Sequence, residues 1–367
     1  MAELLKTIYS DSFFERFLKS FEEVLPQFDS AGFMKSVHDA EWESRELKQR
    51  MRHITLCLGN YLGDDYKKNV GTILDLVEIL RQDDYGIDTL GFIFLPDFIE
   101  VYGQDEFEIS MNAMETVTQF VSCEFAIRPF TLKNQEAAFA ILLKWSKHQN
   151  LHVRRLSSEG CRPRLPWAMG LPNLKKDPSA ILPILENLKN DESEYVRRSV
   201  ANNVNDISKD HPAIAIDLVK KWHGTNPNMD WVAKHASRTL LKQGNNEIMQ
   251  LFGFGDIDHI KCKDFKVITP KIRIGESLEF SFKLQNTNTA SSKIRVEYGI
   301  YYQKANGTLS RKVFKISEKE YPGKSISEII RKQSFKPITT RVYHLGKHEV
   351  SIILNGKEVQ RKKFELI

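Results

Sequence analysis

The sequence predicts two folds in series, an all-α HEAT-like repeat solenoid over residues 1–254 and an all-β immunoglobulin-like sandwich over residues 255–367. Two observations predict this order. Apolar residues recur at steps of three and four in the first part of the chain, which is typical of amphipathic helices. After about residue 254 they alternate in twos, which is typical of strands with one buried face. A chain of 367 residues is long enough for two separate cores.

The first third is expected to be helical. Segments 13–28, 46–62 and 69–82 carry apolar residues at helical spacing, and Gly63 with the following aspartate is a stop between the last two. Segment 114–130 places apolar residues around a glutamate and is expected to form a single element that Pro129 ends or kinks, because proline lacks an amide donor.

The middle of the chain contains a weak internal repeat. The sequences HVRRLSS (152–158), YVRRSVA (195–201) and WVAKHAS (231–237) align without gaps, and ILPILENL and AIAIDLVKKW supply partner helices between them. A period of about 40 residues with two helices per unit is typical of HEAT-like solenoids. The valine of each copy is expected to face the core. The basic residues that follow are expected to line one edge of a concave surface, namely Arg154, Arg155, Arg197, Arg198, Lys234 and Arg238.

The last third has the pattern of a sandwich. SLEFSFKLQNT places four apolar residues on one side, and KIRVEYGIYY, RKVFKIS, HEVSIIL and QRKKFELI behave similarly, with turns at NTNTASS, KANGT and LNGK. About seven short strands in this length fit an immunoglobulin-like sandwich. The sequence lacks the Cys…Trp…Cys pattern of disulfide-pinned immunoglobulin domains. GFGDIDH is the expected joint between the two folds.

Several classes of protein are disfavoured by composition. The longest apolar runs are far shorter than the ~20 residues of a membrane span, so no membrane association is expected. The start, MAELLKTIYSDSFF, has no secretory pattern, which makes a cytoplasmic location the expectation. The cysteines are widely spaced and show no zinc-binding pattern, so reduced thiols and no metal or cofactor are expected. They are Cys57, Cys123, Cys161 and Cys262.

The net charge of +5 conceals an uneven distribution. Residues 1–127 hold 11 basic against 24 acidic residues, a net charge of −13, whereas residues 128–254 carry +7 and residues 255–367 carry +11. A basic surface over the last two thirds favours a polyanionic partner. The alternative is that these lysines only form a solvent-exposed surface and bind no partner, as in many proteins.

The most informative stretch is NLHVRRLSSEGCRPRLPW, residues 150–167. Its first part is an expected helix on which Arg155, Glu159 and Arg162 share a face, because residues three or four apart are neighbours on a helix. Two prolines then stop the helix, and Trp167 follows them directly. One short stretch therefore offers a carboxylate between two guanidiniums, with an indole next to them.

This stretch, together with EFAIRPF upstream and VRRSVANNVNDISKDHP downstream, resembles the AlkC-type family of bacterial HEAT-like DNA glycosylases, relatives of the AlkD-type alkylpurine glycosylases. The resemblance covers residues 1–254, and a subset of that family also carries a C-terminal immunoglobulin-like domain. It implies excision of cationic methylated bases, such as 3-methyladenine and 3-methylcytosine, from double-stranded DNA without base flipping. The product would be an abasic site in base excision repair, made by a monomer that is associated with the nucleoid when bound to DNA.

The resemblance also assigns roles to individual residues. Trp167, Glu124 and Glu159 match the catalytic positions of the family, and Asp206 is a possible further member of the catalytic site. Arg155 and Arg162 match basic positions near the lesion. The expected DNA-binding residues are these two arginines, Arg164, and the other basic residues of the repeats named above.

These residue types suit the chemistry. A cationic base is already a good leaving group, and its loss creates an oxocarbenium-like sugar that a nearby carboxylate stabilises. A carboxylate can also hold or deprotonate the attacking water. An indole attracts cations through its face, and arginines bind phosphates bidentately.

Each assignment has a structural alternative. Glu159 with its two arginines could be a surface ion-pair triplet, and Trp167 could fill the core between repeats. Glu124 could simply face solvent. Arg197 and Arg198 could form a solvated face, and Asp206 could cap a helix or turn. The alternative for the whole chain is a non-enzymatic HEAT-repeat scaffold that binds DNA or protein.

Overall fold

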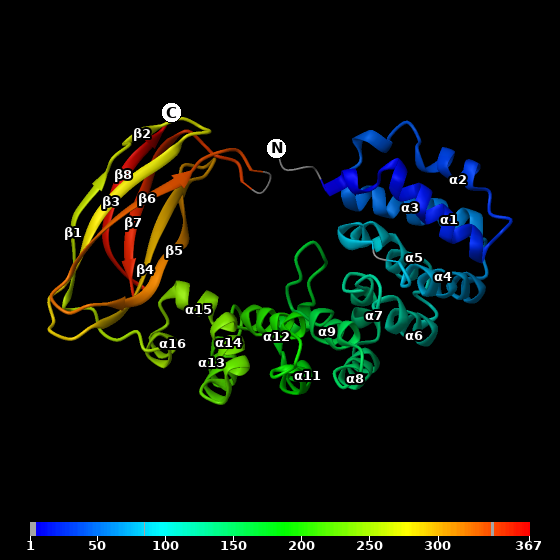
Figure 1. Cartoon of the computed structure of the whole chain (residues 1–367), viewed down its shortest axis with the longest axis horizontal. Coiled ribbons are helices and arrows are strands. Elements are labelled where there is room, and N and C mark those ends of the chain that lie inside the picture. The colour runs from blue at the N-terminus through cyan, green and yellow to red at the C-terminus, as the bar shows by residue number, and fades with distance from the viewer. Residues whose placement is uncertain (1–4, 84, 339–340) are drawn as a thin grey trace. The chain divides into compact units, whose positions relative to one another are not determined.

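The structure is a computed structural model that describes residues 5–83, 85–338 and 341–367. Helices occupy the chain as far as Leu251 and strands begin at Ile260, so the predicted order of an all-α part and an all-β part is confirmed (Figure 1). Residues 1–4, on which the expectation of no secretory signal partly depends, lie outside the described residues. Within the described ranges, no helix is long and apolar enough to cross a membrane.

The helical part consists of α-helices joined by short connections and a few 3-10 turns. The α-helices are α1 (Asp11–Val24), α2 (Ser30–Val37), α3 (Leu47–Leu62), α4 (Tyr66–Leu80), α5 (Phe94–Tyr102), α6 (Phe107–Val117), α7 (Ile127–Lys133), α8 (Gln135–Trp145), α9 (Leu151–Glu159), α10 (Pro172–Lys176), α11 (Leu182–Leu188), α12 (Glu194–Ile207), α13 (Pro212–Trp222), α14 (Pro227–Ala236), α15 (Arg238–Gln243) and α16 (Asn246–Leu251).

The expectation of a single element over residues 114–130 is wrong. Helix α6 ends at Val117 and α7 begins at Ile127, so Glu124 lies in the connection between two helices. Pro129 stands in the first turn of α7, where a missing amide donor costs nothing because that amide has no partner within the helix. The stop predicted at Gly63 is confirmed, since this glycine ends α3 with a φ of 80°.

The internal repeat corresponds to a regular packing of helices. Val153 in α9, Val196 in α12 and Val232 in α14 are all fully buried, as the alignment of the three copies predicted. Helix α12 packs against both α9 and α14, and the partner helix α11 packs against α9 and α12. The helices that carry the repeat therefore lie side by side and share one core.

The strands form two sheets that enclose a common apolar core. One sheet has the order β1-β3-β6 and the other β2-β8-β7-β4-β5, and the described pairs are antiparallel except β2 with β8. The strands are β1 (Ile260–Val267), β2 (Lys271–Ile272), β3 (Ser277–Asn286), β4 (Ser292–Gln303), β5 (Leu309–Tyr321), β6 (Ile326–Ser334), β7 (Gly346–Leu354) and β8 (Lys357–Leu366).

Strand β3 alternates between buried and half-buried residues as its sequence predicted, but β4 is buried almost throughout. The reason is that segments before β1 cover part of the outer face of its sheet. Lys293 donates to the Phe252 carbonyl, and the turn between β7 and β8 approaches so closely that Gly356 lies against Gly244. An added Cβ on Gly356 would lie 2.3 Å from the Cα of Gly244, so no larger residue fits there.

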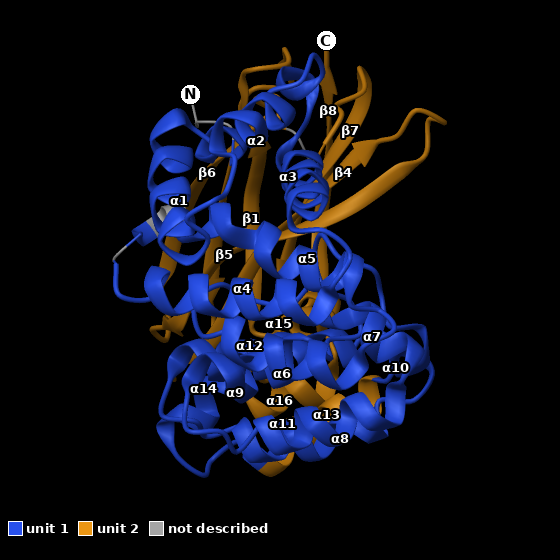
Figure 2. Ribbon diagram, turned by 90° about the vertical axis from the view of Figure 1, so that its right-hand side faces the viewer, with its two compact units in different colours: residues 1–211, 222–236 blue, residues 212–221, 237–367 orange. Residues whose placement is uncertain are grey.

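The chain divides into two compact units (Figure 2). The first comprises residues 1–211 and 222–236, and the second comprises residues 212–221 and 237–367. The second unit thus contains α15, α16 and most of α13 in addition to the sandwich. The change from helix to strand falls between Leu251 and Ile260, whereas the second unit already begins its continuous stretch at Ser237. A domain boundary at residue 254 stays a prediction. All four cysteines are free thiols.

Candidate active site

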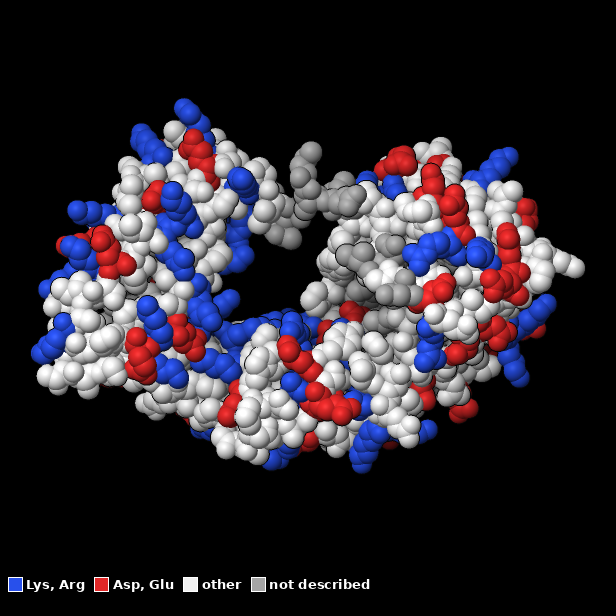
Figure 3. Space-filling model, viewed as in Figure 1, with Lys and Arg blue, Asp and Glu red and all other residues white. Residues whose placement is uncertain are grey.

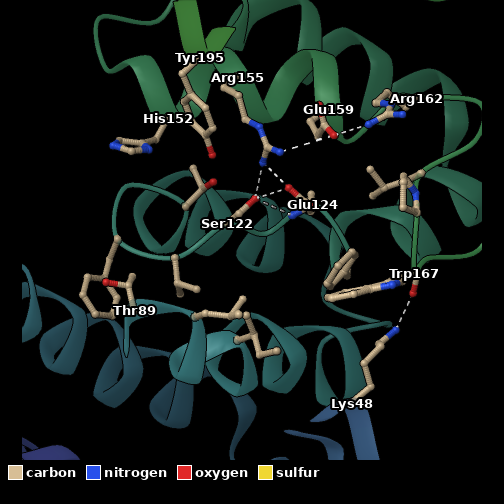
Figure 4. A pocket seen from close by; sticks show the side chains of 18 of the residues that line it. Lys48, Thr89, Ser122, Glu124, His152, Arg155, Glu159, Arg162, Trp167 and Tyr195 are labelled. Atoms are coloured by element: carbon tan, nitrogen blue, oxygen red, sulfur yellow. Dashed lines mark hydrogen bonds and ion pairs between the residues drawn. The ribbon is translucent and has the colours of Figure 1, made fainter. Parts of the chain in front are cut away.

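The first unit contains a cleft of about 600 Å³, within the range of about 300–1,000 Å³ that is usual for ligand sites. The three predicted catalytic residues, Glu124, Glu159 and Trp167, all line this cleft, together with Arg155 and Arg162 (Figure 4). They come from separate elements, namely the connection between α6 and α7, the end of α9, and the loop that follows α9. Folding therefore brings together residues that lie up to 43 positions apart in the sequence.

Glu124 is held by two neighbours. Ser122 donates from its hydroxyl to Glu124 Oε2 over 2.9 Å, and Arg155 Nη1 donates to the same carboxylate oxygen. Arg155 Nη1 also donates to the Ser122 hydroxyl over 2.8 Å, which closes a triangle of hydrogen bonds. The Glu124 side chain is partly exposed, so its carboxylate is fixed in direction but still accessible from the cleft.

Glu159, the last residue of α9, is buried between two arginines. Its Oε1 lies 2.6 Å from Arg162 Nη1 and 3.5 Å from Arg155 Nη2. Burial would raise the pKa of Glu159, but the two guanidiniums outweigh burial and hold that pKa below its ordinary value. Glu159 is therefore ionised at neutral pH. The alternative of a surface ion-pair triplet is wrong, because the side chain of each of the three residues is largely buried.

A second buried acid extends this series of charges. Arg162 donates from Nε to Asp206 Oδ2 over 2.8 Å, and Lys209 contacts Asp206 Oδ1 at 2.9 Å. Asp206 lies near the end of α12 and is almost completely buried. Its carboxylate oxygens bond to the side chains of Arg162 and Lys209, so the alternative of a helix or turn cap does not hold. It pairs with Arg162, which lines the cleft, but it does not line the cleft itself. Its predicted catalytic role would therefore be indirect.

Trp167 stands out from the surface. Its side chain is 60% exposed, so the alternative of a core residue between repeats is wrong. Its backbone has a φ of 64°, a left-handed conformation that costs a residue with a Cβ roughly 1–2 kcal/mol. Lys48 in α3 donates from Nζ to the Trp167 carbonyl over 2.8 Å. A strained, exposed indole that a distant helix holds in place is a feature of binding or catalytic sites rather than of packing.

The aromatic ring of Tyr195 lies at the other end of the charged group. The Arg155 guanidinium lies over this ring, 5.0 Å from its centroid, and the His152 ring meets it edge-on at 5.9 Å. Burial lowers the pKa of His152, and the nearby cations Arg155 and Arg81 lower it further. His152 is therefore neutral at pH 7, and the fixed charges of the cleft are those of the carboxylates, the arginines and Lys48.

The two tandem arginines of each repeat have different surroundings. Arg154 donates from Nη1 to the carbonyls of His148 and Gln149, and it also binds Asp191 through two hydrogen bonds. Arg197 occupies the equivalent position in the next copy and donates to the carbonyls of Asp191 and Glu192. The first arginine of each pair thus fixes the connection before its own helix. A DNA contact by either residue stays a prediction.

The other predicted DNA contacts are more accessible. Arg198 is exposed and pairs with Glu194, with its guanidinium 6.0 Å from the Trp231 ring centroid. Arg164 is half-buried and pairs with Asp210 at 2.6 Å. Lys234 lies in α14, and Arg238 begins α15 in the second unit. On the face that Figure 3 shows, basic side chains are spread over the strand-rich unit with acidic side chains among them.

Within residues 5–83, 85–338 and 341–367, no group of three or more His, Cys, Asp or Glu side chains is arranged to hold a metal ion. The chemistry that the cleft supports is that of two carboxylates, three nearby cations and exposed aromatic rings.

Several residues of the site were missed by sequence reasoning. Tyr195 had a signal, because it occupies the repeat position of His152 one unit later. Ser122 also had one, since a serine hydroxyl often accepts from the backbone amide two residues on, as it does here from Glu124. Lys48 lies 119 residues from the tryptophan that it contacts and had no local signal.

Helices in repeated pairs, a cleft with two carboxylates beside an exposed tryptophan, and a C-terminal sandwich are together the features of a DNA alkylation repair enzyme. Residues 111–243 match the family described as DNA alkylation repair enzyme, and residues 261–367 match the family described as uncharacterised protein YhaZ, C-terminal Ig-like domain. The chain belongs to the AlkC-type family of DNA alkylation repair enzymes that carry a C-terminal immunoglobulin-like domain.

Two relatives cover the whole chain. The structure of Pseudomonas fluorescens alkylpurine DNA glycosylase AlkC, bound to DNA containing an abasic site analog, aligns with a TM-score of 0.90 and 36% identity over 100% of both chains. The Bacillus subtilis (strain 168) protein YhaZ, described as uncharacterized, is 42% identical over 362 residues, which are 99% of each chain. The similarity therefore includes both the helical part and the sandwich.

Proposed function

We propose that the chain is a DNA glycosylase that hydrolyses the N-glycosidic bond of cationic alkylated bases, such as 3-methyladenine and 3-methylcytosine, in duplex DNA. The product is an abasic site for base excision repair. The observation that carries this proposal is the opening of the Glu124 and Glu159 carboxylates and the Trp167 indole onto one cleft. The full-length similarity to a glycosylase bound to DNA supports DNA as the substrate.

The proposed mechanism is electrostatic. As the bond to the cationic base breaks, positive charge moves to the sugar, and a carboxylate beside the sugar stabilises it. At ~4 Å and an effective dielectric constant of ~20, one such contact contributes up to ~4 kcal/mol. Half of that value corresponds to roughly thirtyfold in rate. The same carboxylate holds the water that attacks the sugar, and the Trp167 indole contributes cation–π attraction.

Arg155 links this mechanism to DNA binding. In the structure its guanidinium pairs with Glu124 and contacts Glu159. A DNA phosphate is a competing partner for a guanidinium, because both carboxylates and phosphates accept two parallel hydrogen bonds. We propose that phosphate binding draws Arg155 away from Glu124, so that the full negative charge of this carboxylate meets the sugar.

The proposal includes removal of the base without flipping, as the family resemblance implies. An indole that projects from the surface suits contact with a duplex.

The proposal also includes monofunctional activity, because a strand-cleaving lyase needs an amine nucleophile. Lys48 is the lysine that lines the cleft, and its ammonium donates to a backbone carbonyl. Borohydride treatment of the reaction is therefore expected to trap no covalent adduct with DNA.

The decisive experiment measures the release of 3-methyladenine and 3-methylcytosine from methylated duplex DNA. Glu124→Gln, Glu159→Gln and Trp167→Ala are expected to slow release at least about tenfold while DNA binding is retained. Glu136→Gln, at an exposed position in α8 outside the cleft, is the matched control and is expected to leave release unchanged. The scaffold alternative, favoured by the pairing of both carboxylates with arginines, predicts DNA binding without release of any base.

A further inference from the structure

The loop that carries Trp167 is fastened at both ends by a single buried side chain. This loop joins α9 to α10 and comprises residues 160–171. Arg128, in α7, is fully buried and donates from Nε to the Met169 carbonyl over 2.6 Å and from Nη1 to the Gly160 carbonyl over 3.0 Å. The guanidinium therefore bridges two points of the loop that are nine residues apart in sequence and that enclose Trp167.

The bridge uses a property that only arginine has. A guanidinium holds its donors in a rigid planar fork, whereas a lysine ammonium is a single centre on a flexible stem. Burial lowers the pKa of Arg128 to about 10, so the side chain still carries its charge at neutral pH. Its third nitrogen, Nη2, has no hydrogen-bond partner in the described part of the chain. Burying a charge lowers the stability of the fold unless the charge is paired or hydrogen-bonded. Both hydrogen bonds that the Arg128 guanidinium donates go to this one loop.

We infer that Arg128 is a positioning residue that fixes the direction of the Trp167 indole, with Lys48 as a second support. The inference rests on the proposed function of Trp167. Arg128 fixes the two arms of the loop, and Lys48 holds the carbonyl of Trp167 itself. Because the Trp167 side chain is largely exposed, few contacts of its own determine where the ring points. The two cationic side chains supply that constraint from α7 and α3.

The test is fluorine NMR of protein labelled with 5-fluorotryptophan. The chain has five tryptophans, so five resonances are expected, and Trp167→Phe assigns the one of interest. In Arg128→Lys the Trp167 resonance is expected to shift and broaden while the other four stay in place and report an intact fold. Arg50→Lys is the matched control, because Arg50 is also buried and donates to the carbonyls of Arg45 and Lys6. Its guanidinium lies over the Trp42 ring, 4.4 Å from the centroid, so this variant is expected to move the Trp42 resonance and to leave that of Trp167 in place.

The activity readout separates positioning from binding. Single-turnover base release by Arg128→Lys at saturating protein is expected to fall about 10²-fold, the effect of a displacement of about 1 Å. The dissociation constant for DNA is expected to stay unchanged, because Arg128 is fully buried and does not line the cleft. A sharp, unshifted Trp167 resonance in Arg128→Lys, or a loss confined to DNA affinity, would overturn the inference. If the wild-type protein releases no base, the proposed function fails, while the fluorine spectrum still tests the loop.

A collapse of all five resonances in Arg128→Lys would mean that this variant is unfolded. Lys48→Met then decides, because Lys48 is exposed and its loss leaves the core untouched. Broadening of the Trp167 resonance in Lys48→Met supports the inference, and an unchanged resonance contradicts it.

Discussion

Arg155 donates a hydrogen bond from Nη1 to the carboxylate of Glu124, a residue 31 positions earlier in the chain. Its other terminal nitrogen, Nη2, lies 3.5 Å from Glu159. One guanidinium thus contacts both predicted catalytic acids, which come from different elements. The charges of the two acids are coupled through it, so the effects of substitutions at these three positions are not expected to be additive.

The two acids are expected to differ in what their loss costs. Glu124 is the more accessible, so Glu124→Gln is expected to lower single-turnover base release about 10²-fold and stability by only about 1 kcal/mol. Glu159 is buried between Arg155 and Arg162, and Glu159→Gln is expected to lower stability by about 3 kcal/mol and release about tenfold. Urea unfolding and excision assays on the same preparations check both. A larger stability loss in Glu124→Gln would contradict this division.

The pH dependence of stability is expected to contain a contribution from Glu159. Its two arginine neighbours outweigh burial and hold its pKa below the ordinary value of 4.5. The unfolded chain therefore binds a proton at higher pH than the folded protein does. The stabilisation is fully present above about pH 4.5 and is lost as the pH falls through the lower pKa of the folded state. The stability difference between wild type and Glu159→Gln, measured by urea unfolding, is expected to shrink between about pH 5 and about pH 3. A difference that is constant with pH would show that the glutamine replaces the carboxylate without any loss of charge interaction.

Replacing Trp167 separates backbone strain from function. Both Trp167→Ala and Trp167→Gly remove the indole, but only glycine adopts a φ of 64° without a Cβ clash. The glycine variant is therefore expected to be more stable than the alanine variant by about 1 kcal/mol in urea unfolding. Both are expected to lose base release to a similar extent. Equal stabilities would mean that the loop relaxes when the indole is absent.

The sequence predicts contacts well where they are local. The spacing of Arg155, Glu159 and Arg162 on one helical face corresponds to the ion pairs observed, and the aligned valines of the repeat are all buried. Local spacing determines such contacts because a helix has a fixed period.

Contacts between distant segments had no such signal. The hydrogen bonds from Arg155 to Glu124, from Lys48 to Trp167 and from Arg128 to its loop depend on how connections are placed between packed helices. The continuous burial of β4 has the same origin, since segments that precede β1 cover a face whose sequence indicated exposure. The positive φ of Trp167 was also hidden, because the usual indicator of that conformation is glycine.

The two arginines of the second repeat provide a test of the DNA-binding assignment. Arg198 is exposed and its pairing with Glu194 is a weak surface contact, so it is available to a phosphate. Arg197 is committed to the carbonyls of Asp191 and Glu192. Arg198→Gln is therefore expected to reduce the slope of log affinity against log salt by about 0.9, the value for one phosphate neutralised on B-DNA. Arg197→Gln is expected to leave that slope unchanged and to lower stability by about 1–3 kcal/mol, because buried carbonyls lose their donor.

Fluorescence anisotropy with a labelled duplex over a salt series measures the slopes, and urea unfolding measures the stabilities. The opposite pattern, with a reduced slope only in Arg197→Gln, would mean that DNA displaces Arg197 from its carbonyls and that the first arginine of the pair is the phosphate contact.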